Sequence, residues 1–224
     1  MEINRIVYCE DAITWLNSSP ILTGSSLVAS IPDFSEFPKL TLEEWKKWFF
    51  DTATLVMSKC PDDGVSIFYQ TDIKVDGTWI DKGFICQKAA ELLGFHLLWH
   101  KIICRAPAGT TLFGMPSYTR ILCFSKNLKC DIAKSSPDVI PAMGKKTWPR
   151  GMGFEATNMI AKFIATQTYS KTIVHPFCGE GSMLAAANSY GLKAVGIEKS
   201  PKRAEKSRRL EISKDQKIWY LINL

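Results

Sequence analysis

The chain of 224 residues lacks several patterns that would decide its chemistry at once. Its seven cysteines form no C-x-x-C pair and its three histidines have no regular spacing, so no zinc site is predicted. No apolar run approaches the roughly 20 residues of a membrane-spanning helix. The odd number of cysteines and the lack of an apolar N-terminal leader favour a reducing compartment inside the cell, cytoplasmic or nuclear. There is also no internal repeat. A length of 224 residues suits one α/β domain with a sizeable buried core.

One glycine-containing turn carries the strongest functional signal. The segment His175-Pro-Phe-Cys-Gly-Glu-Gly-Ser182 follows a predicted strand over residues 172–174 and opens a helix near Ser182. Gly179 and Gly181 allow the backbone to turn sharply and to approach a ligand closely. A second predicted strand ends at Glu198, about 20 residues further on, where a carboxylate can accept hydrogen bonds from the ribose of an adenosine cofactor.

The turn favours a cofactor without phosphate. A dinucleotide loop normally reads G-x-G-x-x-G, and here the third glycine is missing while Glu180 would repel a pyrophosphate. S-adenosylmethionine fits better, and an oxidoreductase using a dinucleotide is the weaker alternative. Cys178 is interpreted as a small turn residue, and His175 equally well as a ligand contact or a structural histidine. The predicted cofactor-binding residues of this part of the chain are His175, Pro176, Phe177, Cys178, Gly179, Gly181, Ser182 and Glu198.

Strands and helices alternate along the chain, which predicts a mainly parallel, doubly wound Rossmann-like sheet covered on both faces. Thr41 and Glu44 form a capping box at the start of one helix. Only about 40 residues follow Gly181, so the remaining strands must come from the N-terminal side. The predicted strands are 5–9, 25–31, 64–71, 96–104, 119–125 and 172–174, and the predicted helices are 12–16, 41–56, 82–93 and 154–166.

Taken in order, these motifs resemble the circularly permuted, amino-type nucleic-acid methyltransferases, the S-adenosylmethionine-dependent class that includes adenine-N6 and cytosine-N4 DNA methylases. The resemblance rests on Glu10-Asp11-Ala12, Ile31-Pro32-Asp33-Phe34, Arg120 to Lys126, Gly153-Phe154-Glu155-Ala156, the glycine turn, and Gly196-Ile197-Glu198. It implies further cofactor contacts from Asp11, Ile31 and Phe154. It also implies a single methyltransferase domain over 1–224, with a catalytic half at 1–126, a connecting segment at 127–150 and a cofactor-loop half at 151–224.

The tetrapeptide departs from the pattern of the class, Asp-Pro-Pro-Tyr, whose first side chain accepts hydrogen bonds from the target amine. Ile31 cannot accept a hydrogen bond. The catalytic residues implied here are Pro32, Asp33 and Phe34, with Asp33 as a substitute acceptor or a general base and Phe34 as a stacking platform for a base. Asp33 could instead be only a turn or cap residue, and Phe34 only a core residue.

Charge and length bear on the substrate. The net charge of +6 and a run of cations over residues 199–209 favour contact with nucleic acid, although such a helix is often only a solvated face. Lys145, Lys146 and Arg150 add a second basic group beside Trp148. Neither 106–118 nor 127–150 is long enough for a sizeable recognition insert, which favours a base or ribose of structured RNA as the target, recognised by shape or with help from a protein partner, and leaves single-stranded DNA open. The alternatives are a DNA amino-methyltransferase acting on adenine N6 or cytosine N4, a catalytically silent scaffold for an active partner, and a methyltransferase acting on protein or a small molecule.

Overall fold

The computed structural model describes residues 4–212 and 219–221. Its helices are α1 (Ala12–Ser18), α2 (Leu42–Ser58), α3 (Lys82–Leu92), α4 (Phe154–Gln167), α5 (Ser182–Ser189) and α6 (Pro201–Arg209), with short 3-10 turns η1 (Phe34–Glu36) and η2 (Ile132–Lys134). Its strands are β1 (Arg5–Tyr8), β2 (Ser25–Ala29), β3 (Ser66–Gln70), β4 (Ile73–Val75), β5 (Thr78–Ile80), β6 (His96–Cys104), β7 (Tyr118–Ser125), β8 (Val139–Ile140), β9 (Thr172–His175), β10 (Lys193–Ile197), β11 (Leu210–Ile212) and β12 (Trp219–Leu221).

Eight strands form one sheet in the order β1-β10-β9-β2-β3-β7-β6-β8. The neighbours from β1 to β3 pair in parallel, whereas β7 runs antiparallel to both β3 and β6. The late strand β9 therefore lies beside the early strand β2, and their carboxyl ends meet at one edge. The glycine turn after β9 and the tetrapeptide after β2, which are far apart in the sequence, therefore lie at the same edge of the sheet. The arrangement agrees with the predicted, mainly parallel α/β fold.

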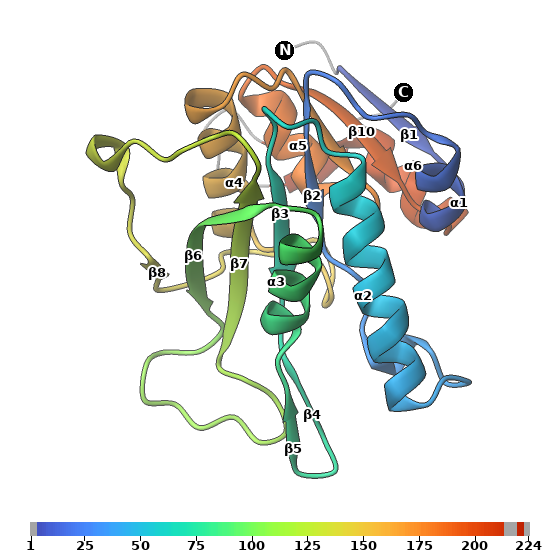
Figure 1. Ribbon diagram of the computed structural model, residues 1–224, viewed down its shortest axis with the longest axis vertical. Coiled ribbons are helices and arrows are strands. Elements are labelled where there is room, and N and C mark those ends of the chain that lie inside the picture. The colour runs from blue at the N-terminus through green and yellow to red at the C-terminus, as the bar shows by residue number, and fades with distance from the viewer. Residues whose placement is uncertain (1–3, 213–218, 222–224) are drawn as a thin grey trace.

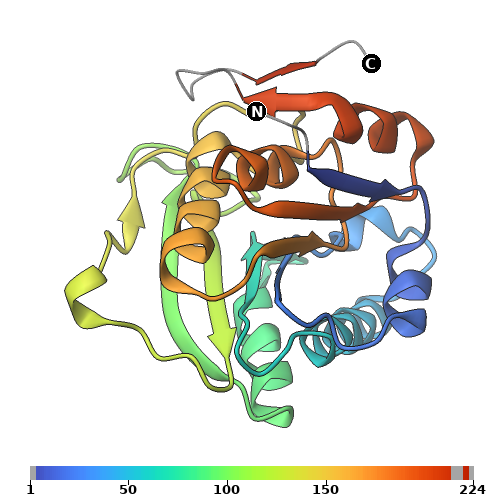
Figure 2. The same ribbon diagram turned by 90° about the horizontal axis from the view of Figure 1, so that it is seen from above.

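Helices cover both faces of the sheet (Figures 1 and 2). On one face α4 and α5 pack over a cluster of buried side chains that includes Ile160 and Leu184. On the other face α1, α2 and α3 enclose a second cluster around Trp45, Phe49 and Phe68. The layered burial fixes the strand ends in place, which is what a site at the sheet edge requires.

The local signals in the sequence predict most elements within a few residues. The capping box is confirmed: the Glu44 amide donates to Thr41 Oγ1 over 3.3 Å and the Thr41 amide donates to Glu44 Oε2 over 2.8 Å. The hairpin β4–β5 was not predicted, although Asp76 and Gly77 have φ of 49° and 74° and form the Asp-Gly turn typical of tight hairpins. The short strands β8 and β11–β12 were not predicted either, since two or three residues give too little periodicity.

No helix within residues 4–212 and 219–221 is both long and apolar enough to cross a membrane.

Candidate active site

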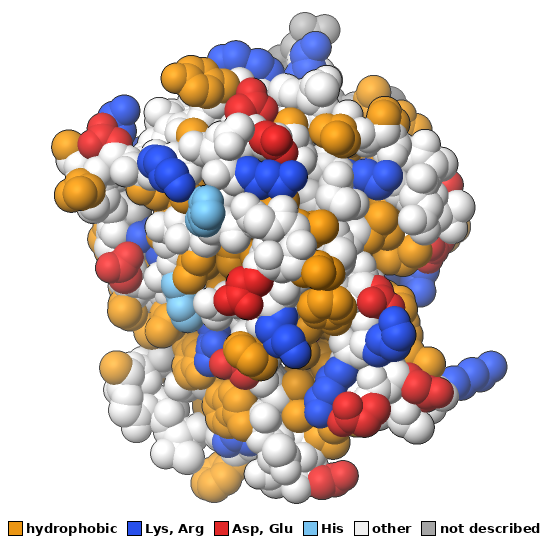
Figure 3. All heavy atoms as spheres, in the orientation of Figure 1, with side chains coloured by type: hydrophobic (Ala, Val, Ile, Leu, Met, Phe, Trp, Pro, Cys, Tyr) orange, Lys and Arg blue, Asp and Glu red, His pale blue; other side chains and the backbone are white. Residues whose placement is uncertain are grey.

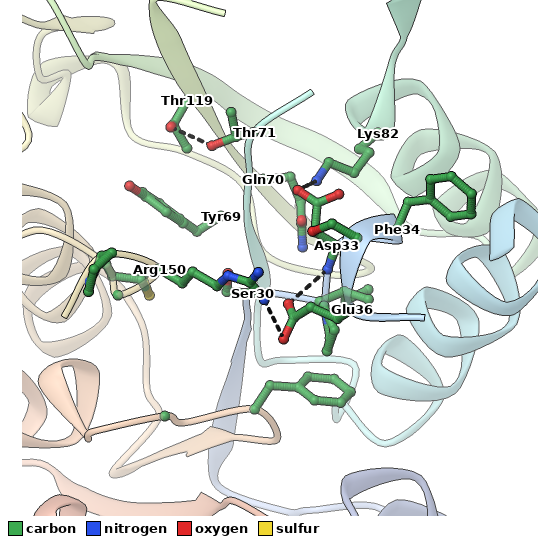
Figure 4. A pocket seen from close by; sticks show the side chains of 18 of the residues that line it. Ser30, Asp33, Phe34, Glu36, Tyr69, Gln70, Thr71, Lys82, Thr119 and Arg150 are labelled. Carbon is green, nitrogen blue, oxygen red and sulfur yellow. Dashed lines mark hydrogen bonds and ion pairs between the residues drawn. The ribbon is translucent and has the colours of Figure 1, made fainter. Parts of the chain in front are cut away.

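A cavity of about 740 Å³ opens at the carboxyl edge of β10, β9, β2 and β3. It runs from the glycine turn after β9 to the residues that follow β2 and β3 (Figure 4). Ligands in open α/β sheets bind at this edge, where the chain reverses between the two halves of the sheet. Of the residues predicted from the sequence, the cavity is lined by Asp11, Ile31, Pro32, Asp33, Phe34, His175, Pro176, Phe177, Cys178, Gly179, Ser182 and Glu198.

The glycine turn has the tight geometry that the sequence predicts. Gly179 and Gly181 have φ of +56° and +87°, where other residues are strained. A Cβ at Gly181 would lie 2.5 Å from Ser207 Oγ, so this glycine is required for packing against α6. A Cβ at Gly179 would lie 3.3 Å from the Trp148 ring, which closes over the turn from the segment before α4. Gly181 thus supports the turn from behind the cavity and Gly179 faces into it.

Glu198 lies at the end of β10 with its carboxylate 8% exposed. Its Oε2 accepts from the Gly179 amide at 3.2 Å, and its Oε1 accepts from the Ser200 amide at 2.8 Å. Arg203 donates to the same Oε1 from Nε at 3.0 Å and from Nη2 at 2.8 Å, and its guanidinium lies over the Trp148 ring. The carboxylate predicted to bind ribose therefore also ties the turn to α6.

His175, the last residue of β9, is 2% exposed and its Nδ1 has no hydrogen-bond partner. Burial lowers the pKa of this imidazole to about 4, so the side chain is neutral near pH 7. An open, buried polar atom in the wall of a cavity fits a polar ligand. Cys178 lies in the same turn but has a thiol whose pKa burial raises to about 12, so it is protonated and unsuited to nucleophilic attack.

Two of the implied cofactor residues have structural roles. Asp11 caps α1 by accepting from the amides of Ile13 and Thr14, although it also lines the cavity. Phe154 begins α4, and it is absent from the cavity wall. The nearby segment 146–152 contributes to the wall in its place, so part of the predicted connecting segment 127–150 belongs to the site.

Asp33 follows β2 and its carboxylate is 37% exposed toward the cavity. Its backbone amide donates to Glu36 Oε1 at 3.2 Å, at the start of η1. Asp33 is thus also the N-cap of η1, which is the structural role that the sequence allows for it. Lys82 Nζ lies 3.6 Å from Asp33 Oδ2, and the Lys82 side chain is only 3% exposed. Burial lowers the pKa of Lys82, while Asp33 and Asp72 oppose that shift.

The ring of Phe34 packs against Trp45 of α2, with ring centroids 5.8 Å apart. Figure 4 shows it turned toward the helices, although the residue contributes to the cavity wall. Ile31 is buried in the apolar cluster on the same side of the sheet. Stacking on a base therefore remains a prediction for Phe34, and it would require the ring to leave Trp45.

Three residues that complete this end of the cavity were missed by the sequence reasoning. Tyr69 and Gln70 end β3, and Lys82 begins α3. Gln70 is 2% exposed and its Nε2 has no hydrogen-bond partner. Tyr69 and Gln70 are two polar residues at the end of an otherwise apolar strand, and this pattern could have indicated a site. Nothing in the sequence around Lys82 distinguishes it from an ordinary helix residue.

Cations surround the mouth of the cavity. Arg105 and Lys146 both line it, and the pKa of Lys146 is lowered first by burial and then by the charge of Arg105. Arg150 pairs with Glu36 at 3.0 Å. The basic helix α6 differs, because four of its five cations, Arg203, Lys206, Arg208 and Arg209, form ion pairs with Glu198, Glu180 and Glu205. The positive charges of Arg105 and Lys146 at the rim are therefore less neutralised by acidic partners than those of α6, the helix for which the sequence predicts contact with nucleic acid.

Within the described part of the chain, no three His, Cys, Asp or Glu side chains come together in a way that could hold a metal ion.

No protein-family model matches the chain, and no curated protein matches it by sequence. Solved structures do match. A DNA modification methylase of Thermus thermophilus, so assigned provisionally and solved with S-adenosyl-L-methionine, aligns with a TM-score of 0.68 and 19% identity over 92% of this chain and 93% of its own. The cytosine-N4-specific PvuII DNA methyltransferase aligns with a TM-score of 0.67 and 18% identity over 95% of this chain and 89% of its own.

A third structure, the M1.HpyAVI complex with S-adenosylmethionine, aligns with a TM-score of 0.62 and 12% identity over 91% of this chain and 98% of its own. The chain therefore has the α/β fold of S-adenosylmethionine-dependent DNA methyltransferases, as its motif order predicts.

Proposed function

We propose that this protein transfers the methyl group of S-adenosylmethionine to a base of a nucleic acid, with DNA as the first candidate. One observation carries the proposal: a single cavity joins the glycine turn after β9 to the polar residues after β2 and β3. A methyl donor and a methyl acceptor must meet in line within one site, and this cavity provides both ends.

The residues at the turn end fit S-adenosylmethionine. Glu198 offers a carboxylate for the ribose, Gly179 allows close approach of the backbone, and the open Nδ1 of His175 suits the expected polar end of the cofactor. When bound, S-adenosylmethionine supplies a methyl group already activated on a sulfonium. The chain's own contribution is to hold the acceptor atom in position and to exclude water.

The mouth of the cavity supports a polyanionic substrate. Arg105 and Lys146 both line the cavity, and two positive charges at the mouth favour contact with phosphate groups. Lys74 also lines the cavity, and its Nζ lies 4.8 Å from the centre of the Trp79 ring, which is 42% exposed on the adjoining β4–β5 hairpin and adds an aromatic surface outside the cavity. On the face drawn in Figure 3, charges of both signs are interspersed and form no broad basic patch.

The comparisons favour DNA over the RNA substrate expected from the sequence. That expectation rested on the shortness of segments 106–118 and 127–150. The three solved structures with this fold are covered over 89–98% of their length by this chain, so short segments do not separate it from them. Two of them are named as DNA enzymes, which supports the DNA substrate that the sequence left open.

The experiment is transfer of tritium from methyl-labelled S-adenosylmethionine to DNA, RNA and protein, each with and without nuclease. We expect label in DNA that DNase removes. Label in RNA alone would restore the expectation from the sequence, and label that survives nuclease would indicate a protein acceptor. Binding of the cofactor without any label would contradict the proposal and favour a silent scaffold. Binding of a dinucleotide instead would favour an oxidoreductase.

A further inference from the structure

The substrate end of the cavity is rich in hydrogen-bond donors. The amide of Gln70 is buried with an open Nε2, and the ammonium of Lys82 is buried 3.6 Å from the carboxylate of Asp33. Figure 4 shows the three side chains around the same part of the cavity. Asp33, at 37% exposed, is the acceptor of the group.

Strand register explains how Gln70 comes to this position. In the parallel pair β2–β3, Val28 is opposite Ile67 and Ala29 is opposite Phe68. The pairing ends there; Gln70 closes β3 two residues after Phe68, and Ile31 follows the end of β2 by two residues. Side chains alternate along a strand, so Gln70 shares the face of Phe68, and Ile31 packs in the same cluster as Phe68. The side-chain amide of Gln70 thus lies on the same face of the sheet as Ile31, the first residue of the tetrapeptide, whose aliphatic side chain has no hydrogen-bonding group.

Lys82 is held firmly in this place. Its backbone amide donates to Asp72 Oδ1 at 2.9 Å, and Asp72 in turn pairs with Arg120 at 3.1 Å. A cation fixed beside the reacting atom selects the charge of that atom in the transition state. Lys82 balances the charge of Asp33 as long as that carboxylate is ionised, and its ammonium is left unpaired only once Asp33 has taken a proton from the substrate. An acidic ring nitrogen that gives its proton to Asp33 is more negative in the transition state than in the neutral substrate, which the unpaired ammonium and the amide stabilise. An exocyclic amine that attacks with its protons in place becomes positive, which they do not stabilise.

We infer that the acceptor atom is an acidic ring nitrogen next to a carbonyl group, of the kind found in thymine, uracil and guanine, and not an exocyclic amine. This inference rests on the proposed function. Asp33 removes the N–H proton, while Lys82 Nζ and Gln70 Nε2 donate to the neighbouring carbonyl oxygen, which shares the negative charge. The N–C bond forms as the sulfonium S–C bond breaks, the thioether leaves neutral, and the proton passes from Asp33 to water.

The decisive experiment identifies the labelled nucleoside. Single-stranded DNA and RNA oligonucleotides containing all four bases are incubated with the protein and methyl-tritiated S-adenosylmethionine, then digested to nucleosides and separated. The inference expects label in N3-methylated thymidine or uridine, or in N1-methylated guanosine or deoxyguanosine. Label in N6-methylated adenine or N4-methylated cytosine would overturn the inference and leave the proposed function standing. No label in either polymer, with the cofactor bound, would overturn both.

A variant test addresses Lys82 itself. Lys82→Met should lower the rate of transfer at saturating cofactor by roughly a hundredfold or more, the effect expected of a lost charge-stabilising group. Its affinity for S-adenosylmethionine should stay within about twofold of the parent. Lys88→Met, on the exposed face of the same helix, is the matched control and should change neither quantity. A Lys82→Met protein with the parent's rate would overturn the role of the ammonium, and product identity decides the question even where this variant does not fold.

Discussion

Glu198 and His175 are two buried polar residues in one wall of the cavity, and their hydrogen bonding differs. The Glu198 carboxylate accepts bonds from Gly179, Ser200 and Arg203, whereas His175 leaves Nδ1 open. With its hydrogen bonds from the protein, the Glu198 carboxylate stabilises the turn even without a ligand, and Oε2, which has a single donor, can still accept from a ribose hydroxyl. The Nδ1 of His175 gains a partner only when a ligand binds. The two residues therefore predict different consequences of substitution.

Glu198→Ala should weaken binding of S-adenosylmethionine by about 1–3 kcal/mol, the effect of losing a hydrogen-bonding charged group. This corresponds to roughly five- to 150-fold in the dissociation constant, measurable by isothermal titration calorimetry. Glu205→Ala, on the exposed face of α6, is the control and should leave the affinity unchanged. An unchanged affinity in Glu198→Ala would contradict the ribose assignment.

His175 predicts a specific dependence of stability on pH. Its pKa falls from 6.5 to about 4 on folding because the imidazole is buried, so the unfolded chain binds the proton more tightly. The contribution of neutral His175 to the free energy of unfolding is fully present above about pH 6.5 and is lost as the pH falls to about 4. The total loss is about 3 kcal/mol.

Urea unfolding at pH 7 and pH 4.5 checks this, with His175→Gln as the comparison. The parent should lose about 2–3 kcal/mol more than the variant over that interval, because glutamine does not titrate. An equal loss in both proteins would show that His175 is not buried in its neutral form.

Among the elements, the β4–β5 hairpin and the start of α3 are joined by one arginine. Arg120 Nε lies 3.1 Å from Asp72 Oδ2 and its Nη1 lies 2.7 Å from Asp81 Oδ1. The Asp72 side chain is fully buried, and burial raises its pKa against the charge of Arg120. The pairing holds Lys82 at the cavity because Asp72 also accepts the Lys82 amide.

Arg120→Met should lower the free energy of unfolding by about 3–5 kcal/mol, since it leaves Asp72 buried without its ionic partner. Lys47→Met removes an exposed pair with Asp51 and should cost no more than about 1 kcal/mol. Urea denaturation of the three proteins distinguishes these values. If Arg120→Met lost as little as Lys47→Met, the pairing would not anchor the hairpin.

The rim of the cavity is formed by two separate segments, the end of β6 and the residues before α4, which contribute Arg105 and Lys146. The double variant Arg105→Ala/Lys146→Ala should reduce the slope of log affinity against log salt for duplex DNA by about 2, one for each lost phosphate contact. Fluorescence anisotropy with a labelled duplex measures this slope. Lys171→Ala/Lys193→Ala removes two exposed cations at the opposite, amino edge of the sheet and should leave the slope unchanged.

At the scale of the whole molecule, the sequence predicts features whose signals are local. The capping box of Thr41 and Glu44, the turn at Gly179 and Gly181, and the acidic end of β10 are each encoded within a few neighbouring residues. The order of these motifs also predicts the sheet, since the late strands must complete a sheet begun by the early ones.

Features that depend on distant contacts could not be predicted in this way. Gln70 and Lys82 reach the site through the pairing of β3 with β2 and the anchoring of α3 by Arg120. Phe154 lies outside the cavity wall, to which residues of the preceding segment 146–152 contribute. The charges of α6 are largely neutralised by acidic partners, of which Glu180 and Glu198 come from other parts of the chain.

In the proposed enzyme, one cavity has a cofactor end at the glycine turn and a reacting end at Asp33. The most direct test compares Asp33→Asn with the parent protein, measuring both methyl transfer to DNA and affinity for S-adenosylmethionine. Asparagine keeps the size of the side chain but removes its charge and basicity. We predict that transfer falls by roughly a hundredfold or more while the dissociation constant of the cofactor stays within about twofold. Unchanged transfer, or a loss of cofactor affinity that accounts for the whole loss of rate, would contradict the account.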